Sequence, residues 1–389
     1  MKQLTVSDGS SSPAERMRWS LVLVQFLAVL ALGIRPSSGA GSLTRCPCPS
    51  LNLCQPLPAD HQYQVEAVVF DNGGSAWMYY DWSKVTTIVT TQPVNPSLLC
   101  QAHEHSVRLV LKEKIRQTHL KNKKDQDIWI RDMAYFVSTQ FMDGIYLELS
   151  HLVTNFKALP KLLMAIKEIF HHKLPGSQVS ISVPWSPDCP DGKCYDYTSM
   201  AQSCDFLYVK AYDMQLEMWD ECFAKANAPY DQTFSGLSHY IQLGVNPKKL
   251  ILGLPWYGND FPCQHFYEPG RCKLSKYVFN GAPCSSQIAK RIAYKDIMQL
   301  IPRSFTGRYW DDNYKSPYFV YMDKDVYHEV WYDDPQSLSL KSSIVKKLKL
   351  GGIGVQFGNN LNYSANPTAA MQTEDMWNAL CPTRLKWRT

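Results

Sequence analysis

Eight short apolar segments, separated by amphipathic segments, restrict this sequence to very few folds. The apolar segments lie at 65–71, 85–91, 107–112, 143–149, 179–185, 206–213, 250–258 and 352–357. Residues 127–140, 159–172, 234–243, 336–348 and 368–380 carry apolar side chains at three- and four-residue spacing, as amphipathic helices do. Eight buried strands alternating with helices predict an α/β fold, a TIM (β/α)8 barrel. An open doubly wound sheet is the alternative, but no Gly-rich nucleotide-binding turn supports it.

One segment interrupts this alternation. Residues 259–326 lie between the seventh and eighth predicted strands and are rich in Cys, Pro, Gly and Tyr. We expect a small α+β insertion that stands over the carboxyl ends of the strands and walls a groove. Residues 41–389 then form one barrel domain that includes this insertion.

The first forty residues have the pattern of a secretory signal peptide. Arg16 and Arg18 precede an apolar run at 21–32, and residues 37–40 are small, as at a cleavage site. An uncleaved anchor is the alternative, although the run is too short to span a bilayer. Removing 1–40 takes away four Lys or Arg and two Asp or Glu, which leaves a net charge of about +3. This mild charge suggests no nucleic-acid partner and, after cleavage, no membrane partner.

All twelve cysteines lie beyond residue 40. An even number behind a signal peptide favours disulfides, whose pairing the sequence leaves open. Metal ligation by Cys46, Cys48 and Cys54 is an alternative, but no matching Cys or His pair accompanies them. We therefore expect a disulfide-bonded protein that is lysosomal or secreted, monomeric and without a cofactor or metal.

One glycosylation sequon is acceptable. Asn362-Tyr363-Ser364 has the required pattern, whereas Asn95 and Asn366 are each followed by proline. A single glycan on Asn362 is therefore predicted.

The segment 141–150 carries the clearest chemical information. Alternate residues of a strand share a face, so Tyr146, Glu148 and Ser150 are predicted to point into the barrel and Leu147 to point outward. Glu148 and Ser150 would lie near the carboxyl end of the strand, where TIM-barrel active sites are built. We expect Asp143, Glu148, Tyr212 and Asp213 to converge at that mouth.

Other polar and aromatic residues also fall at the carboxyl ends of predicted strands. They are Asp71, Trp185, Tyr212 with Asp213, and Trp256 with Tyr257. Aromatic rings at such positions suit sugars, because the C–H face of a pyranose stacks on a π-system. Packing at the barrel rim is the alternative for each ring alone. Their joint occurrence predicts a carbohydrate site.

Segment 141–150 resembles the signature strand of glycoside hydrolase family 18, Asp-x-x-Asp-x-Asp-x-Glu. Asp143 matches the first aspartate, whereas Tyr146, Glu148 and Ser150 occupy the three later acidic positions. The resemblance to one branch of this family extends over the whole mature chain, through stretches such as Cys46-Pro-Cys-Pro, Pro255-Trp-Tyr-Gly258 and Gly281-Ala-Pro-Cys284. It implies a TIM barrel acting on N-acetylglucosamine oligosaccharides.

The resemblance also implies residue roles. In the family the substrate's acetamido oxygen attacks C1, the final glutamate protonates the leaving group, an aspartate two positions earlier orients the acetamide, and a tyrosine supports it. Tyr212 keeps the tyrosine position and Asp213 follows it. Glu148 stands in the place of the orienting aspartate, and Ser150 in the place of the acid. Gln356 occupies the position of a tryptophan that lies under the reactive sugar.

Glu148 does not replace the missing acid on this reasoning. It lies about 6.6 Å down the strand at ~3.3 Å per residue, and one extra methylene does not close that gap. Two hypotheses remain. The first is a catalytically impaired protein that binds chitin-type oligosaccharides. The alternative is an active glycosidase in which another carboxylate, Asp213 first, supplies the proton.

Overall fold

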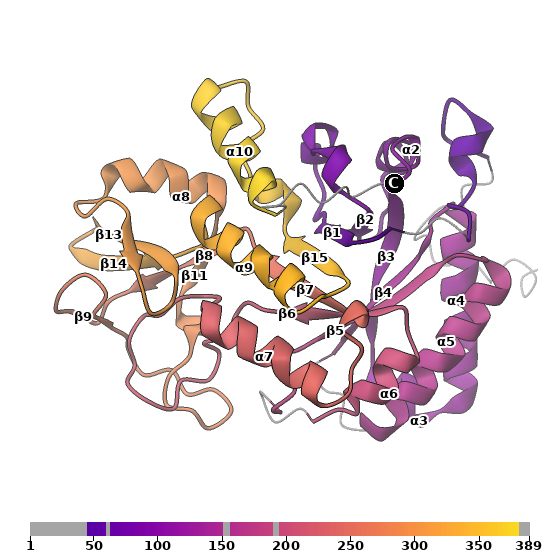
Figure 1. Ribbon diagram of the computed structural model, residues 1–389, viewed down its shortest axis with the longest axis horizontal. Helices are drawn as coiled ribbons and strands as arrows, with labels where there is room; N and C mark the ends of the chain where they lie inside the picture. The colour runs from indigo at the N-terminus through magenta and orange to yellow at the C-terminus, as the bar shows by residue number, and fades with distance from the viewer. Residues whose placement is uncertain (1–44, 60–62, 151–155, 190–193, 381–389) are drawn as a thin grey trace, which may run out of the picture. The chain divides into compact units, whose positions relative to one another are not determined.

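The computed structural model describes residues 45–59, 63–150, 156–189 and 194–380. Eight parallel strands close into a barrel in the order β1-β15-β7-β6-β5-β4-β3-β2 (Figure 1). The strands are β1 (Glu66–Phe70), β2 (Thr87–Thr90), β3 (Arg108–Ile115), β4 (Gly144–Leu149), β5 (Gln178–Val183), β6 (Phe206–Lys210), β7 (Leu250–Pro255) and β15 (Gly352–Gln356). Each overlaps one of the eight predicted segments, so the predicted TIM barrel is confirmed.

Helices on the outside connect the strands. They are α2 (Pro96–Glu104), α3 (Gln117–Lys121), α4 (Lys123–Thr139), α5 (Leu159–Lys173), α6 (Tyr197–Gln202), α7 (Tyr230–Gln242), α9 (Pro335–Lys347) and α10 (Pro367–Ala379). Several begin at a side-chain cap: Asn95, Asn122 and Asn366 accept backbone N–H bonds from the first turns of α2, α4 and α10. No helix in the described parts of the chain is both long and apolar enough to cross a membrane.

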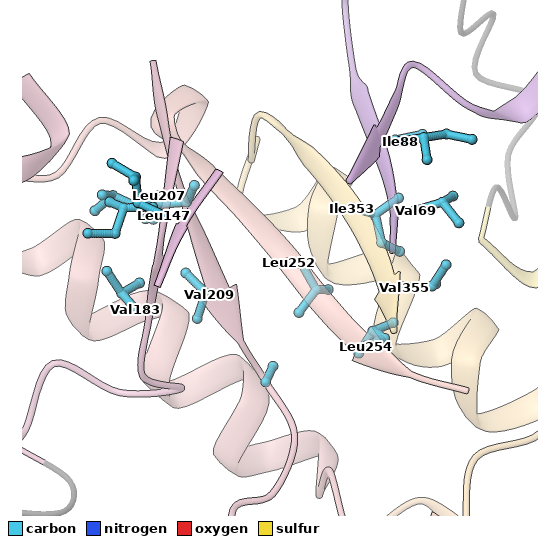
Figure 2. Close-up of a cluster of buried hydrophobic side chains, with 14 of the residues drawn as sticks. Val69, Ile88, Leu147, Val183, Leu207, Val209, Leu252, Leu254, Ile353 and Val355 are labelled. Carbon is cyan, nitrogen blue, oxygen red and sulfur yellow. The ribbon is translucent and has the colours of Figure 1, made fainter. Parts of the chain in front are cut away.

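The strands separate two apolar cores. Outward side chains such as Leu147, Val209 and Leu252 pack beneath the helices (Figure 2). Inward side chains such as Phe70, Tyr146 and Tyr208 fill the barrel interior. The predicted alternation of the fourth strand is therefore confirmed: its odd-numbered residues belong to the outer core, and Tyr146 belongs to the inner one.

The insertion between β7 and β15 is an antiparallel sheet in the order β11-β8-β14-β13-β12. Its strands are β8 (Tyr257–Pro262), β11 (Lys290–Ala293), β12 (Tyr309–Asp311), β13 (Ser316–Asp323) and β14 (Val326–Trp331). A hairpin of β9 (His265–Phe266) and β10 (Cys272–Lys273), and the helix α8 (Tyr294–Leu300), complete it. The insertion extends beyond the expected bounds of 259–326. Strand β14 begins at residue 326 and belongs to the sheet, because it pairs with both β8 and β13.

Five disulfides join described cysteines: Cys46–Cys54, Cys48–Cys100, Cys189–Cys194, Cys222–Cys284 and Cys263–Cys272. The predicted disulfides are confirmed, and Cys204 is a buried free thiol. Burial raises the pKa of Cys204 to about 12. Cys381 and the predicted signal peptide lie outside the described residues. Multiple disulfides are typical of proteins that mature in the secretory pathway.

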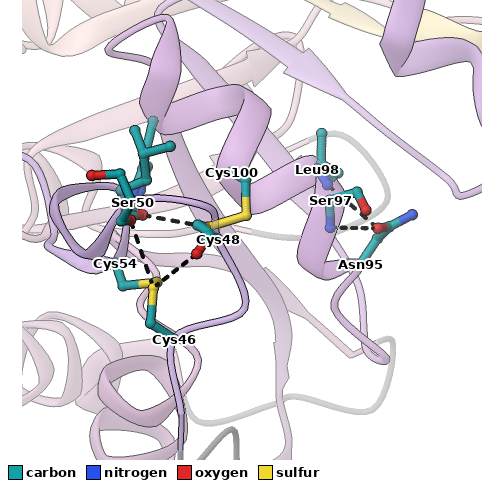
Figure 3. Close-up of a disulfide and its surroundings, with 10 residues drawn as sticks. Cys46, Cys48, Ser50, Cys54, Asn95, Ser97, Leu98 and Cys100 are labelled. Carbon is teal, nitrogen blue, oxygen red and sulfur yellow. Dashed lines mark hydrogen bonds between the residues drawn. A yellow bond between two sulfur atoms is a disulfide. The ribbon is translucent and has the colours of Figure 1, made fainter.

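The three cysteines near the N-terminus are joined by disulfide bonds rather than by a metal ion. The sulfurs of Cys46, Cys48 and Cys54 lie within 4.8 Å of one another, the spacing of a metal site. All three are bound in disulfides, and Cys48 bridges to Cys100 on α2 (Figure 3). The alternative of metal ligation is therefore not supported, because the sulfurs have no free thiolate to offer.

Candidate active site

Strand β4 carries three inward residues at increasing height in the barrel. Tyr146 is fully buried, and its ring packs edge-on against Phe70 and Tyr208 with centroids 4.9 and 5.8 Å away. Burial, with a smaller contribution from the charge of Glu148, raises the pKa of Tyr146 well above its ordinary value. Tyr146 therefore fills the interior as a neutral ring below the mouth.

Glu148 lies one step higher and forms an ion pair with Lys112. The Nζ atom of Lys112, on β3, is 3.0 Å from Glu148 Oε1, and both side chains are about one fifth exposed. The same ammonium group lies 5.8 Å from the centre of the Phe70 ring. Lys112 thus holds the carboxylate of Glu148 on the β3 side of the mouth.

Ser150 follows β4 at the mouth. Its backbone N–H donates to Ile115 O at 3.0 Å, which continues the β4–β3 ladder by one residue. The side chain is half-buried and carries a hydroxyl group. A hydroxyl group there can form hydrogen bonds, but it is a far weaker acid than a carboxyl group.

The carboxyl end of β6 brings together Tyr212, Asp213 and two residues from the insertion. Asp213 has a left-handed backbone with φ of 55°, and its N–H donates to Asn227 Oδ1 at 2.8 Å. Its carboxylate accepts a hydrogen bond from Tyr257 at 3.0 Å and pairs with Arg291 of β11. Burial raises the pKa of Asp213, while Arg291 and Tyr257 oppose that rise.

A pocket of about 330 Å³ opens on the β5–β6 side of the mouth. Its walls include Leu149, Ser182, Trp185, Lys210, Tyr212 and Asp213. The indole of Trp219, also part of the lining, is 66% exposed. A concave site with aromatic walls and a few convergent polar groups has the features of a small-ligand pocket.

Asp143 is not part of this site, and the expectation that it meets Glu148 at the mouth is wrong. It precedes β4 at the opposite end of the barrel and is 2% exposed. Its carboxylate accepts hydrogen bonds from Leu57 N, Leu109 N and His103 Nε2 at 2.7–2.8 Å. Strand direction explains the difference, because a residue before a barrel strand lies at the amino-terminal face.

Trp256 does not present its ring to the mouth either. It is completely buried in the outer core, where it packs edge-on against Trp377 of α10 at 4.9 Å. The alternative given for each ring, packing at the barrel, therefore applies to Trp256. Its neighbour Tyr257 lies in the inner core instead, and its hydroxyl donates a hydrogen bond to Asp213.

Asp71 and Gln356 have different roles at the ends of β1 and β15. Asp71 is buried and accepts hydrogen bonds from Gly73 N and Tyr80 Oη, both at 3.0 Å, so it orders its own loop. Burial raises its pKa against these two hydrogen bonds. Gln356 is half-buried, and its Oε1 atom has no hydrogen-bond partner in the described structure.

The predicted glycosylation site, Asn362, is half-buried, and its Oδ1 atom accepts a hydrogen bond from Ser364 N.

The sequence reasoning missed two basic residues of the site, Lys112 and Arg291. Lys112 carried a usable signal, because it is two residues after the inward Val110 and therefore shares its face. Arg291 carried none, since it comes from the insertion, far along the chain from Asp213. Only the folded insertion brings Arg291 and Asp213 together.

A TIM barrel with an aromatic-walled pocket and carboxylates at its carboxyl-terminal mouth is the architecture of a glycoside hydrolase. The chain belongs to glycosyl hydrolases family 18, whose family model matches residues 116–355. Di-N-acetylchitobiase of Homo sapiens is 41% identical over 348 residues, which cover 88% of this chain and 90% of that protein. A probable di-N-acetylchitobiase of Dictyostelium discoideum is 31% identical over 351 residues, 86% and 90% of the two chains.

Solved structures agree on the fold. A family 18 chitinase from Cycas revoluta, in complex with (GlcNAc)3, matches with a TM-score of 0.64 at 16% identity and covers 81% of this chain and 99% of that one. A chitinase from Chromobacterium violaceum matches with a TM-score of 0.64 at 17% identity, covering 81% and 98%.

Proposed function

We propose that the barrel mouth binds N-acetylglucosamine-containing oligosaccharides and that its hydrolytic activity is impaired. Family membership and the full-length similarity to di-N-acetylchitobiases support the class of ligand. Trp185 and Tyr212 in the pocket offer ring faces and Asp213 a polar partner, as sugar binding requires.

The observation that carries the impairment is the Lys112–Glu148 ion pair beneath a serine. Ser150 holds the position that the family resemblance gives to the general acid, and its hydroxyl is too weak an acid to protonate a leaving group. Glu148 Oε1 lies 3.0 Å from Lys112 Nζ, so its carboxylate is paired with β3. It also lies two residues before position 150 on the strand, about 6.6 Å from the place of the family's acid.

A working chitobiase-type glycosidase is the second candidate, and the comparisons favour it over the first. The human relative, 41% identical over nearly its whole length, is a di-N-acetylchitobiase. Asp213 is the first substitute acid to consider, because burial raises its pKa and so favours a protonated form. Its bond to Tyr257 and its pairing with Arg291 work in the opposite direction.

One experiment separates the two candidates. Release of N-acetylglucosamine from chitobiose and from an aryl glycoside is measured at pH 4–6, beside calorimetric binding of chitotriose. Binding without turnover supports the impaired protein. Turnover that disappears in Asp213→Asn but persists in Asp188→Asn, an exposed aspartate at the rim of the same pocket, supports the enzyme with Asp213 as its acid.

The remaining parts of the proposal concern the mature protein. We propose cleavage near Ala40, a glycan on Asn362, a monomer, and sorting to the lysosome or the extracellular space. Peptide mapping of protein secreted from cultured cells tests the cleavage site and the glycan together.

A further inference from the structure

The small net charge of the chain conceals one strongly basic segment. Residues 112–124 contain six lysines and arginines and one glutamate, an excess of five positive charges, the same as the formal net charge of all 389 residues. The segment runs from the end of β3 through α3 into the first turn of α4. The overall charge is therefore no guide to the potential at this edge of the barrel.

Most of these cations face solvent without a carboxylate partner. Lys114, Arg116, Lys121 and Lys124 are exposed, and none of the four forms an ion pair with an acidic group in the described part of the chain. Lys112 and Lys123 do have partners, Glu148 and Asp127. We call the four exposed residues the basic patch.

The fold holds the basic patch in place. Asn122 caps α4 through hydrogen bonds from Lys124 N and Asp125 N, and Gln126 Nε2 donates to His119 O at 3.0 Å, which ties α4 to α3. His119 stacks on Trp129 at 4.1 Å, and its Nδ1 accepts a hydrogen bond from Arg116 N. Figure 1 shows α3 and α4 on the same side of the barrel. The four charges are thus presented by ordered elements.

The basic patch continues into the candidate active site. Lys114 is paired in register with Glu148 across the β3–β4 ladder, and Ile115 O accepts the hydrogen bond from Ser150 N. One end of the basic patch, at Lys114, therefore lies on the strand that borders Glu148 and Ser150.

We propose that the basic patch binds a sulfated polysaccharide chain of the heparin type. Exposed lysines and arginines clustered within a short segment suit a linear polyanion, whose condensed counterions are released on binding. The disulfides place the protein among chains of the secretory pathway, where such glycans occur.

Two other polyanions fit this surface less well. A membrane surface favours basic segments with apolar side chains that insert, but Ile115 and Leu120, the two aliphatic residues of this segment, are buried. A single-stranded nucleic acid favours aromatic rings free to stack on bases, and the face of Trp129 is occupied by His119.

The test compares two variants that remove the same charges. The patch variant combines Lys114→Gln, Arg116→Gln, Lys121→Gln and Lys124→Gln. The control variant combines Lys276→Gln, Arg303→Gln, Lys324→Gln and Lys346→Gln, four exposed cations scattered over other elements. A third variant replaces the three patch lysines by arginine and so keeps the charge. Thermal unfolding of each variant checks that the fold is retained.

Binding of a heparin decasaccharide is measured by calorimetry at 0.05–0.3 M NaCl. We expect the patch variant to bind roughly a hundredfold more weakly than wild type near 0.15 M NaCl and with a shallower salt dependence. The control and arginine variants should stay within a few-fold of wild type, and a desulfated decasaccharide should not bind.

Equal loss in the patch and control variants, or no wild-type binding at 0.15 M NaCl, overturns the proposal. So does tighter binding to phosphatidylserine-containing vesicles or to an oligonucleotide than to the decasaccharide. Chitotriose binding by the patch variant is measured in parallel, because it reports the barrel mouth separately and distinguishes failure of this proposal from failure of the proposed function.

Discussion

Asp143 and Glu148 lie near the two ends of β4, and their carboxylates have different surroundings. Asp143 is buried at the amino-terminal face, where three hydrogen-bond donors surround its carboxylate. Glu148 lies near the carboxyl-terminal mouth, where one partly exposed lysine pairs with it. Four residues of strand therefore separate an enclosed carboxylate from one near the barrel mouth.

The difference follows from the direction of a parallel barrel. TIM-barrel active sites are built at the carboxyl-terminal face, so a carboxylate at the other face can serve the fold alone. There, His103 forms hydrogen bonds with Asp143 and with Leu53 O, both at 2.8 Å, and so links the disulfide-bonded N-terminal segment to the barrel. Two similar side chains thus have different surroundings, one enclosed by donors and one partly exposed beside a lysine.

Asp143→Ala should have the largest effect on stability. It leaves the His103 side chain and two backbone N–H groups buried without their acceptor, which should lower the free energy of unfolding by about 3–5 kcal/mol. Urea unfolding measures this loss. Asp143→Asn is the matched control and should lose less, because its amide oxygen still accepts a hydrogen bond. A loss below about 1 kcal/mol in Asp143→Ala would contradict the structural role.

If hydrolysis is impaired as proposed, recovering it at the other end of the strand should require several changes. We expect Ser150→Glu combined with Glu148→Asp and Gln356→Trp to exceed Ser150→Glu alone by roughly a hundredfold in kcat/KM on chitobiose, because a misplacement of ~1 Å can cost that much. In the single variant we expect the longer Glu148 to crowd the acetamide group and the reactive sugar to lack a stacking surface. Including Tyr146→Asn tests whether the buried ring also interferes. A single variant as fast as the triple would show that only the acid was missing.

The His103–Asp143 pair should make stability depend on pH. Burial alone would lower the pKa of His103, but the hydrogen bond to Asp143 and its negative charge outweigh burial and raise the pKa. A raised folded-state pKa means that the native protein binds the proton more tightly than the unfolded chain. The stabilisation is then complete below the unfolded value of about 6.5 and is lost as pH rises through the folded value.

Urea unfolding at pH 5.5–8.5 measures this dependence. His103→Gln should flatten a decline of about 1 kcal/mol, whereas His239→Gln, whose side chain is 43% exposed beside Asp188, should change it much less. The same slope in both variants would exclude His103 as its source.

Breaking the Lys112–Glu148 pair should have the smallest effect on stability. Both side chains are partly exposed, so Lys112→Met or Glu148→Gln should cost about 1 kcal/mol or less in urea unfolding. The double variant gives the coupling free energy of the pair. A loss as large as that of Asp143→Ala would remove the contrast between the two ends of β4.

Parts of the candidate site followed from local sequence alone. The alternation Tyr146, Glu148, Ser150 fixed which side chains face inward, and the positions of Tyr212 and Asp213 after the sixth strand placed them at the mouth. The expectation for Trp256 rested only on its place at a strand end. Alternation along β7 gives Trp256 the outward face of Leu252 and Leu254, and it lies with them in the outer core.

The sequence by itself determined the barrel, since eight apolar segments with helices between them have few ways to bury their surfaces. It also determined the inward face of β4. Only the tertiary structure decided which charges meet: Lys112 with Glu148, Arg291 with Asp213, and His103 with Asp143. Strand periodicity is set by bonds between neighbouring residues, whereas these pairs join positions 36 or more residues apart in the sequence, and their distances depend on how the whole barrel and its insertion close.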